Sequence, residues 1–127
     1  MIFLKNSKCQ HIYCEVFKAS FFIYFGCTPE YFLLHSKKIA KDINLDLSNF
    51  SPSNQGKALS NIRKGIFIIW TRDKNIFSLI HETGHVISEL LKSRGIPHNE
   101  YTEEIYCYYQ EWLCFKVLGR YKWPRKS

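Results

Sequence analysis

Apolar and polar side chains alternate near the start of the chain. Between His11 and Phe17, the residues Ile12, Cys14 and Val16 fall on one side, and Tyr, Glu and Phe residues fall on the other. This period of two is typical of a β-strand. The apolar segment from Phe21 to Phe25 follows closely and predicts a second strand.

A stronger strand is predicted from Ile66 to Trp70, where β-branched and aromatic residues follow one another without interruption. Gly65 precedes this run, and a polar Thr-Arg-Asp segment follows it. Upstream, the segment from Asn44 to Lys64 is rich in Ser and Asn. We therefore expect mostly loop there, with a short strand near Lys57 to Ser60.

Two predicted helices are marked by their first residues. Thr28 is a suitable N-cap, and Pro29 fits the first position of a helix that runs to about Lys41. A further helix is predicted from about Thr102 to about Gly119, because glutamates occupy its first turn. Negative charge at that place interacts favourably with the helix dipole.

The most regular helical pattern runs from about Asp73 to Lys92. Asp73 can cap its N-terminus, and Gly95 stands where such a helix would be closed. Apolar and small residues recur in it at helical spacing, which predicts a buried stripe. The stripe consists of Ile76, Ile80, Thr83, Ile87 and Leu90.

These elements predict an α+β fold in which a small sheet packs on helices. The chain has 127 residues, of which 46% are hydrophobic and 17% aromatic. That is enough material for one packed core, so we expect a single domain spanning residues 1–127.

Charge and hydropathy limit the classes of partner. The net charge is +7, but the basic residues are scattered, which favours a solvated basic surface over a nucleic-acid site. Tyr121 and Trp123, interleaved with the basic residues of the tail, keep nucleic acid as a possible partner. Neither a signal peptide nor a membrane span is indicated, so we expect a cytoplasmic protein that makes no membrane contact.

Five cysteines form an odd set without a Cys-x-x-Cys pair, which favours reduced thiols over disulfides or a cysteine zinc site. Cys107 and Cys114 lie seven residues apart. On a helix this spacing puts both on one face, where we expect buried thiols.

The chemistry is concentrated in the segment His81-Glu82-Thr83-Gly84-His85. The two histidines are four residues apart in a helix, so both imidazoles project from the same face and can bind one Zn²⁺. Glu82 leans to the side, where its carboxylate can hold a metal-bound water. Random placement would give about 0.01 such patterns in a chain of this composition. We therefore predict a catalytic zinc site, with Glu82 as the general base.

A catalytic zinc site commonly has three protein ligands, so a third donor is needed. Glu104 is the favoured candidate, because it opens the next predicted helix, whose antiparallel return would run alongside the histidine-bearing helix. Glu103 competes with it, although a glutamate at a helix N-terminus also has a dipole role. His98 is a further candidate in the connecting segment, where a surface role is more usual.

Three segments together resemble small phage-encoded zincin-like metallopeptidases, which are similar in plan to ImmA/IrrE-type proteases. The resemblance extends over roughly Gly65 to Leu118, and the segments that carry it are Leu79 to His85, Arg94 to Ile96 and Glu103 to Tyr108.

When the site roles of this family are transferred to the matching positions of this sequence, the resemblance implies that His81 and His85 bind zinc. It also implies that Glu82 is the general base and that Glu104 is the remaining ligand. It also implies a zincin-like domain, in which the motif helix follows a sheet strand. Cys107 departs from the pattern, since the family commonly has a small residue such as Ala there. A thiol can pack equally well at that place.

The predicted activity is hydrolysis of a peptide bond in a protein or peptide substrate. Glu82 would accept a proton as the zinc-bound water attacks the carbonyl. A second donor could stabilise the transition state. The candidates are Tyr101, Tyr106, Tyr108 and His98.

Two questions stay open at this stage. If the strand from Ile66 to Trp70 lies at a sheet edge, it could hold an extended peptide across the zinc, whereas its unbroken apolar sequence favours a central position.

The alternative function is a catalytically silent, metal-containing phage accessory protein that binds a host protein or nucleic acid. The presence of Glu82 argues against it, because a structural metal site needs no general base.

Overall fold

The computed structural model of the protein describes residues 9–43 and 55–120. Predictions that concern the N-terminal eight residues, most of the Ser- and Asn-rich loop, Tyr121 and Trp123 lie outside these residues. Within them, the architecture is α+β, with one four-stranded sheet and three α-helices.

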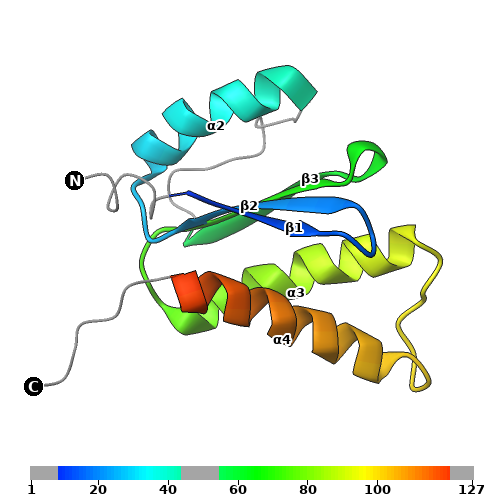
Figure 1. Cartoon of the computed structure of the whole chain (residues 1–127). Coiled ribbons are helices and arrows are strands. Elements are labelled where there is room, and N and C mark those ends of the chain that lie inside the picture. The colour runs from blue at the N-terminus through cyan, green and yellow to red at the C-terminus, as the bar shows by residue number, and fades with distance from the viewer. Residues whose placement is uncertain (1–8, 44–54, 121–127) are drawn as a thin grey trace, which may run out of the picture.

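The sheet has the order β1-β2-β4-β3 (Figure 1). The strands are β1 (Gln10–Cys14), β2 (Ala19–Phe25), β3 (Gly56–Asn61) and β4 (Ile66–Thr71). β1 and β2 pair antiparallel, β2 and β4 pair parallel, and β3 pairs antiparallel with β4. A short 3₁₀ helix, η1 (Ile62–Lys64), joins β3 to β4.

β4 therefore lies inside the sheet, so the hypothesis that it is an edge strand is wrong. Its residues Phe67, Ile68, Ile69 and Trp70 are fully buried on both faces, which is what an uninterrupted apolar strand requires. In the described part of the chain, the edge beside β4 is formed by β3, whose six residues are all half-buried.

Helices cover both faces of the sheet (Figure 1). α2 (Pro29–Ile43) lies on one face, and α3 (Ile76–Ser93) and α4 (Glu103–Arg120) pack together on the other. The predicted cap of α2 is confirmed, because Thr28 Oγ1 accepts a hydrogen bond from the Tyr31 amide at 3.1 Å. Each face has its own apolar core cluster, one beneath α3 and α4 and the other beneath α2.

The N-terminus of α3 differs from its prediction. Asn75, not Asp73, is the N-cap, and its side chain accepts from the Phe77 amide at 2.8 Å. Asp73 instead accepts from the amide of Asn75 at 3.1 Å and so shapes the turn before the helix. Gly95 follows the helix with a φ of 82°, which confirms the expected left-handed closing position.

The buried stripe of α3 is also rotated from the predicted one. Thr83, Ile87 and Leu90 are buried as expected, but Ile76 and Ile80 are 39% and 42% exposed. A neighbouring row of side chains packs on the sheet instead. It includes Leu79, Glu82, Val86 and Leu91. Helical spacing alone defines several adjacent rows, and packing decides among them.

The prediction that Cys107 and Cys114 are buried thiols on one face is wrong for the first. Cys107 is exposed, whereas Cys114 is half-buried and its sulfur lies 3.3 Å from Thr83 Oγ1 on α3. The α3 helix contacts Cys114 and leaves Cys107 exposed, so a spacing of seven residues does not give both thiols the same burial. Within residues 9–43 and 55–120, no helix combines the length and the hydrophobicity needed to cross a bilayer.

Candidate metal and peptide site

The two histidines of the motif meet on the exposed side of α3. Their Nε2 atoms are 3.1 Å apart, and the rings are nearly perpendicular at 86°. Two nitrogens bound to one tetrahedral Zn²⁺ at about 2.0–2.1 Å would be about 3.3–3.4 Å apart. The pair His81 and His85 therefore fits two positions in the coordination sphere of one zinc ion.

The turn between β4 and α3 sets the direction in which these histidines point. Thr71, the last residue of β4, donates from Oγ1 to the Asp73 carbonyl at 2.8 Å and accepts from the Gly26 amide at 3.0 Å. The hydroxyl thus ties the start of α3 to the end of β2. With the buried row of α3 on the sheet, His81 and His85 remain exposed beside β3.

Glu82 is buried against β3, with only 8% of its surface exposed. Burial raises the pKa of its carboxyl above the ordinary 4.5, although His81, His85 and Lys57 act in the opposite direction. A carboxyl with a raised pKa can exchange a proton closer to neutral pH, which suits a general base.

Gly56 makes room for this carboxyl. A Cβ atom at Gly56 would lie 2.9 Å from Glu82 Oε2 and 3.1 Å from the Trp70 carbonyl oxygen. The first residue of β3 must therefore lack a side chain if Glu82 is to keep its place. Sequence reasoning missed Gly56, because only the pairing of β3 and the packing of α3 bring residues 56 and 82 together.

The histidine pair and Glu82 open into a cleft between α3 and β3, with a volume of about 420 Å³. The cleft is lined by Gly56, Lys57, Ala58, His81, Glu82, His85 and Glu89. Glu89 could have been found from the sequence, since it stands four residues after His85 and seven after Glu82 on the same helix. The β3 residues could not, because strand order is a tertiary property.

The register of the β3–β4 pairing determines which peptide groups of β3 face the sheet edge. The Arg72 amide donates to the Gln55 carbonyl at 2.8 Å, just before the first β3–β4 pair, Gly56↔Thr71. Hydrogen-bonded and non-hydrogen-bonded pairs alternate along an antiparallel ladder. The peptide groups of Gly56, Ala58 and Ser60 consequently face away from β4, toward the edge.

α4 closes the other side of α3, two turns beyond its own start. Gln110 Nε2 donates to the Ile80 carbonyl at 3.0 Å, and a Cβ at Gly84 would lie 3.2 Å from that nitrogen. Gly84 thus permits close approach of the two helices. α4 reaches the histidine turn of α3 with Gln110 and Cys114, not with its first turn.

The structure does not bring Glu104 to the histidine pair. Glu103 and Glu104 are both exposed in the first turn of α4, and Glu104 precedes Gln110 by six residues, or about 9 Å along a helix axis. In residues 9–43 and 55–120, no group of three His, Cys, Asp or Glu side chains is placed to hold a metal ion. Two of the three predicted ligands are therefore together, and the third is not.

The candidate oxyanion donors also lie away from the cleft lining. Tyr106 is buried, donates its hydroxyl to the Ile96 carbonyl and stacks on His98 with ring centroids 4.2 Å apart. Both residues thereby shape the connection between α3 and α4. Tyr101 is 86% exposed.

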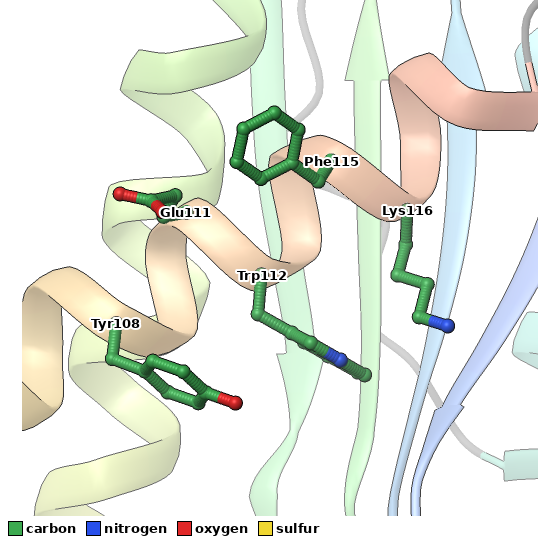
Figure 2. A pocket seen from close by; sticks show the side chains of 5 residues that line it. All are labelled: Tyr108, Glu111, Trp112, Phe115 and Lys116. Atoms are coloured by element: carbon green, nitrogen blue, oxygen red, sulfur yellow. The ribbon is translucent and has the colours of Figure 1, made fainter.

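Tyr108 belongs to a different hollow, of about 390 Å³, on the outer side of α4. Figure 2 shows that all of its lining residues come from this one helix. They are Tyr108, Glu111, Trp112, Phe115 and Lys116. None of these side chains lines the histidine cleft.

Comparisons with models of protein families, with curated proteins and with solved structures find no match to this chain.

Proposed function

We propose that this protein is a zinc-dependent metallopeptidase with a zincin-like arrangement of strand, motif helix and second helix. The observation that carries the proposal is the convergence of the His81 and His85 Nε2 atoms, 3.1 Å apart, beside the buried carboxyl of Glu82. A pair of imidazoles and a carboxyl of raised pKa in one open cleft are the parts that metal-assisted hydrolysis of an amide requires.

The roles of the protein groups follow from their places. His81 and His85 hold the ion, which when bound polarises a carbonyl and makes water more acidic. Glu82 accepts the proton of the attacking water and returns it to the leaving amine. Its burial against Gly56 keeps the carboxyl in place and raises its pKa.

β3 supplies a means of holding the substrate. The peptide groups of Gly56, Ala58 and Ser60 face the sheet edge at the cleft, and an extended peptide can pair with such an edge as an additional strand. The role that the sequence suggested for the strand from Ile66 to Trp70 thus passes to its neighbour. A protein or peptide is accordingly the proposed substrate.

Glu104 remains the proposed third ligand, with Glu103 as its competitor. Either carboxylate would have to approach the histidines from the first turn of α4. Loss of zinc affinity in Glu104→Ala, but not in Glu103→Ala, would assign the ligand. Equal affinities in both variants and the wild type would remove Glu104 from the site.

The test of the function combines metal analysis with hydrolysis. We expect about one zinc per chain and cleavage of a mixed peptide library, detected by mass spectrometry. Glu82→Gln should retain the zinc and lose about 10²- to 10⁴-fold in rate, since only the proton acceptor is removed. Glu111→Gln, the same change on the outer side of α4, should retain both.

The competing function is a binding protein whose metal has only a structural role. Zinc in the wild type together with equal, background cleavage by wild type and Glu82→Gln would favour it. Absence of zinc after reconstitution would contradict the metallopeptidase proposal altogether.

A further inference from the structure

The outer side of α4 carries an apolar stripe in addition to the one that is buried. On its inner side, α4 buries Tyr106, Leu113 and Val117 against α3 and the sheet. On its outer side, apolar residues recur at intervals of three and four, and Tyr108 and Phe115 are 62% and 67% exposed. This outer stripe consists of Ile105, Tyr108, Trp112 and Phe115. An exposed apolar row of this kind marks an interaction surface.

Two opposite charges flank the outer stripe, one on each side (Figure 2). Glu111 and Lys116 are both exposed, and they project to opposite sides of the row of aromatic rings. In heptad notation, Trp112 is an a position and Tyr108 and Phe115 are d positions. Glu111 and Lys116 are then the g and e positions beside them. Apolar a and d positions flanked by opposite charges are typical of a helix that pairs with a second helix of the same sequence.

The spacing of these charges determines the direction of such a pair. In a parallel pair, a g residue faces the e residue five positions later on the other helix. Glu111 of one copy then meets Lys116 of the other, and two-fold symmetry repeats the contact. In an antiparallel pair, the same symmetry places g beside g and e beside e, so like charges would share each flank. The charges therefore favour parallel helices.

We propose that this protein forms a symmetric dimer with a second copy of itself, through parallel pairing of the two α4 helices. Tyr108 and Phe115 of one copy pack against the same residues of the other. The hollow of about 390 Å³ between these side chains receives side chains of the facing helix. The surface is specific for its own copy, because its charges complement those of the same surface after a two-fold rotation.

This dimer is expected to be weak. α4 has 18 residues, about two and a half heptads, and Trp112 is already half-buried, with its ring 6.3 Å from that of Phe21. The paired surface is thus smaller than a standard protein interface, and we expect a dissociation constant of about 10–100 µM. The inference does not depend on the proposed function, because none of the stripe residues lines the histidine cleft.

The test is analytical ultracentrifugation of the full chain at about 1–300 µM, a range that brackets the expected constant. EDTA is present so that zinc cannot bridge two copies, and a reducing agent prevents a disulfide between exposed Cys107 thiols. We expect the wild type to change from monomer to dimer over this range. Phe115→Ala removes the most exposed ring of the stripe and should weaken the dimer by about tenfold or more.

Reversal of the charges gives a sharper result. Glu111→Lys and Lys116→Glu should each weaken the dimer by about tenfold or more, because each variant places two pairs of like charges across the interface. An equimolar mixture of the two variants should restore dimers, and so should both reversals in one chain. The pairing of opposite charges at the interface is re-created in both cases.

General charge effects predict a different outcome. The two single reversals change the net charge of +7 by two units in opposite directions, so general repulsion would weaken association in only one of them. Lys37→Glu is the matched control, since it makes the same charge change at an exposed position of α2. It should leave the dimer unchanged.

A monomer throughout the concentration range would overturn the proposal and leave the stripe to a different partner. Dimers that the single reversals do not weaken would also overturn it, because an antiparallel pair or another surface would then form them. A mixture of the two variants that stays monomeric would have the same meaning. The metallopeptidase proposal fails separately, on equal cleavage by the wild type and Glu82→Gln, and sedimentation does not bear on that result.

Discussion

Two histidine environments on opposite faces of the sheet show how differently the same side chain is used. On α2, the Nδ1 atom of His35 lies 2.7 Å from the hydroxyl of Tyr24 on β2, and its ring stacks on Tyr31. On α3, His81 and His85 direct their Nε2 atoms toward each other at the open cleft. His35 has its polar partner on the sheet, whereas the two α3 histidines are hydrogen-bond partners of each other.

The surroundings reinforce the contrast. Burial, and then the positive charge of Lys38, lower the pKa of His35, so the folded protein favours its neutral form. The buried carboxyl of Glu82 stands beside the α3 pair. One histidine thus belongs to a structural contact, and the other two stand beside a group that can move a proton.

Substitution of the histidines should separate the two environments most strongly. His81→Ala is expected to weaken zinc affinity by more than about 100-fold, because it removes a ligand itself and not only a supporting group. His35→Ala should leave zinc binding intact and cost about 1–3 kcal/mol of unfolding free energy, since the buried Tyr24 hydroxyl loses one of its two hydrogen-bond partners. Zinc titration and urea unfolding measure the two effects. Loss of zinc in both variants would contradict the comparison.

Gly56→Ala is expected to have a smaller effect, confined to the α3 face. The added methyl group would displace the Glu82 carboxyl, so the rate of peptide cleavage should fall by about tenfold or more while zinc binding is kept. Gly119→Ala is the matched control, because a Cβ there meets no atom within 4 Å. An unchanged cleavage rate in Gly56→Ala would show that the strand does not hold the carboxyl in its working position.

The smallest effects concern pH, and they have opposite signs on the two faces. In metal-free protein, the raised pKa of Glu82 means that the folded state binds the proton more tightly than the unfolded state. Its contribution to stability is therefore present below pH 4.5 and is lost as the pH rises through the folded pKa. Glu82→Gln should become more stable relative to the wild type over that interval.

His35 should behave in the reverse way. Its pKa is lower in the folded state than the ordinary 6.5, so its contribution is present above pH 6.5 and is lost as the pH falls through the folded pKa. His35→Asn should be most destabilised relative to the wild type near neutral pH and less so in acid. Urea unfolding at several pH values, with EDTA present, compares both variants. Differences of the same sign in the two would refute the assignment of these groups.

Local sequence signals predicted most of the elements, because the residues that decide them are neighbours in the chain. Thr28 caps α2 with its own side chain, and Gly95 closes α3 because it accepts a positive φ. The apolar run of β4 and the short strand over residues 57–60 were also confirmed. Where the prediction was wrong, as in the choice of Asp73 over Asn75, two residues only two positions apart offered the same capping chemistry.

Part of the candidate site was predictable for the same reason. A spacing of four residues in a helix places His81 and His85 on one side whatever surrounds them. The burial of Glu82, the role of Gly56 and the position of Lys57 were not predictable, since each depends on β3 packing next to α3. The position of Glu104 was not predictable in this way. Antiparallel helices were expected, but the contacts of Gln110 and Cys114 determine how far along its axis α4 meets the histidine turn of α3.

What the sequence determined by itself was the set of helices and strands and the pairing of two imidazoles on one helical turn, because these depend on contacts within a few residues. The tertiary structure alone decided that β4 is central and β3 lies beside it at the cleft. It also decided that Glu82 is buried and that Glu89 is held to Ser60 across the cleft. Glu82 meets Gly56 and Glu89 meets Ser60 across 26 and 29 residues of chain, and strand order and helix packing, not local spacing, determine which segments meet.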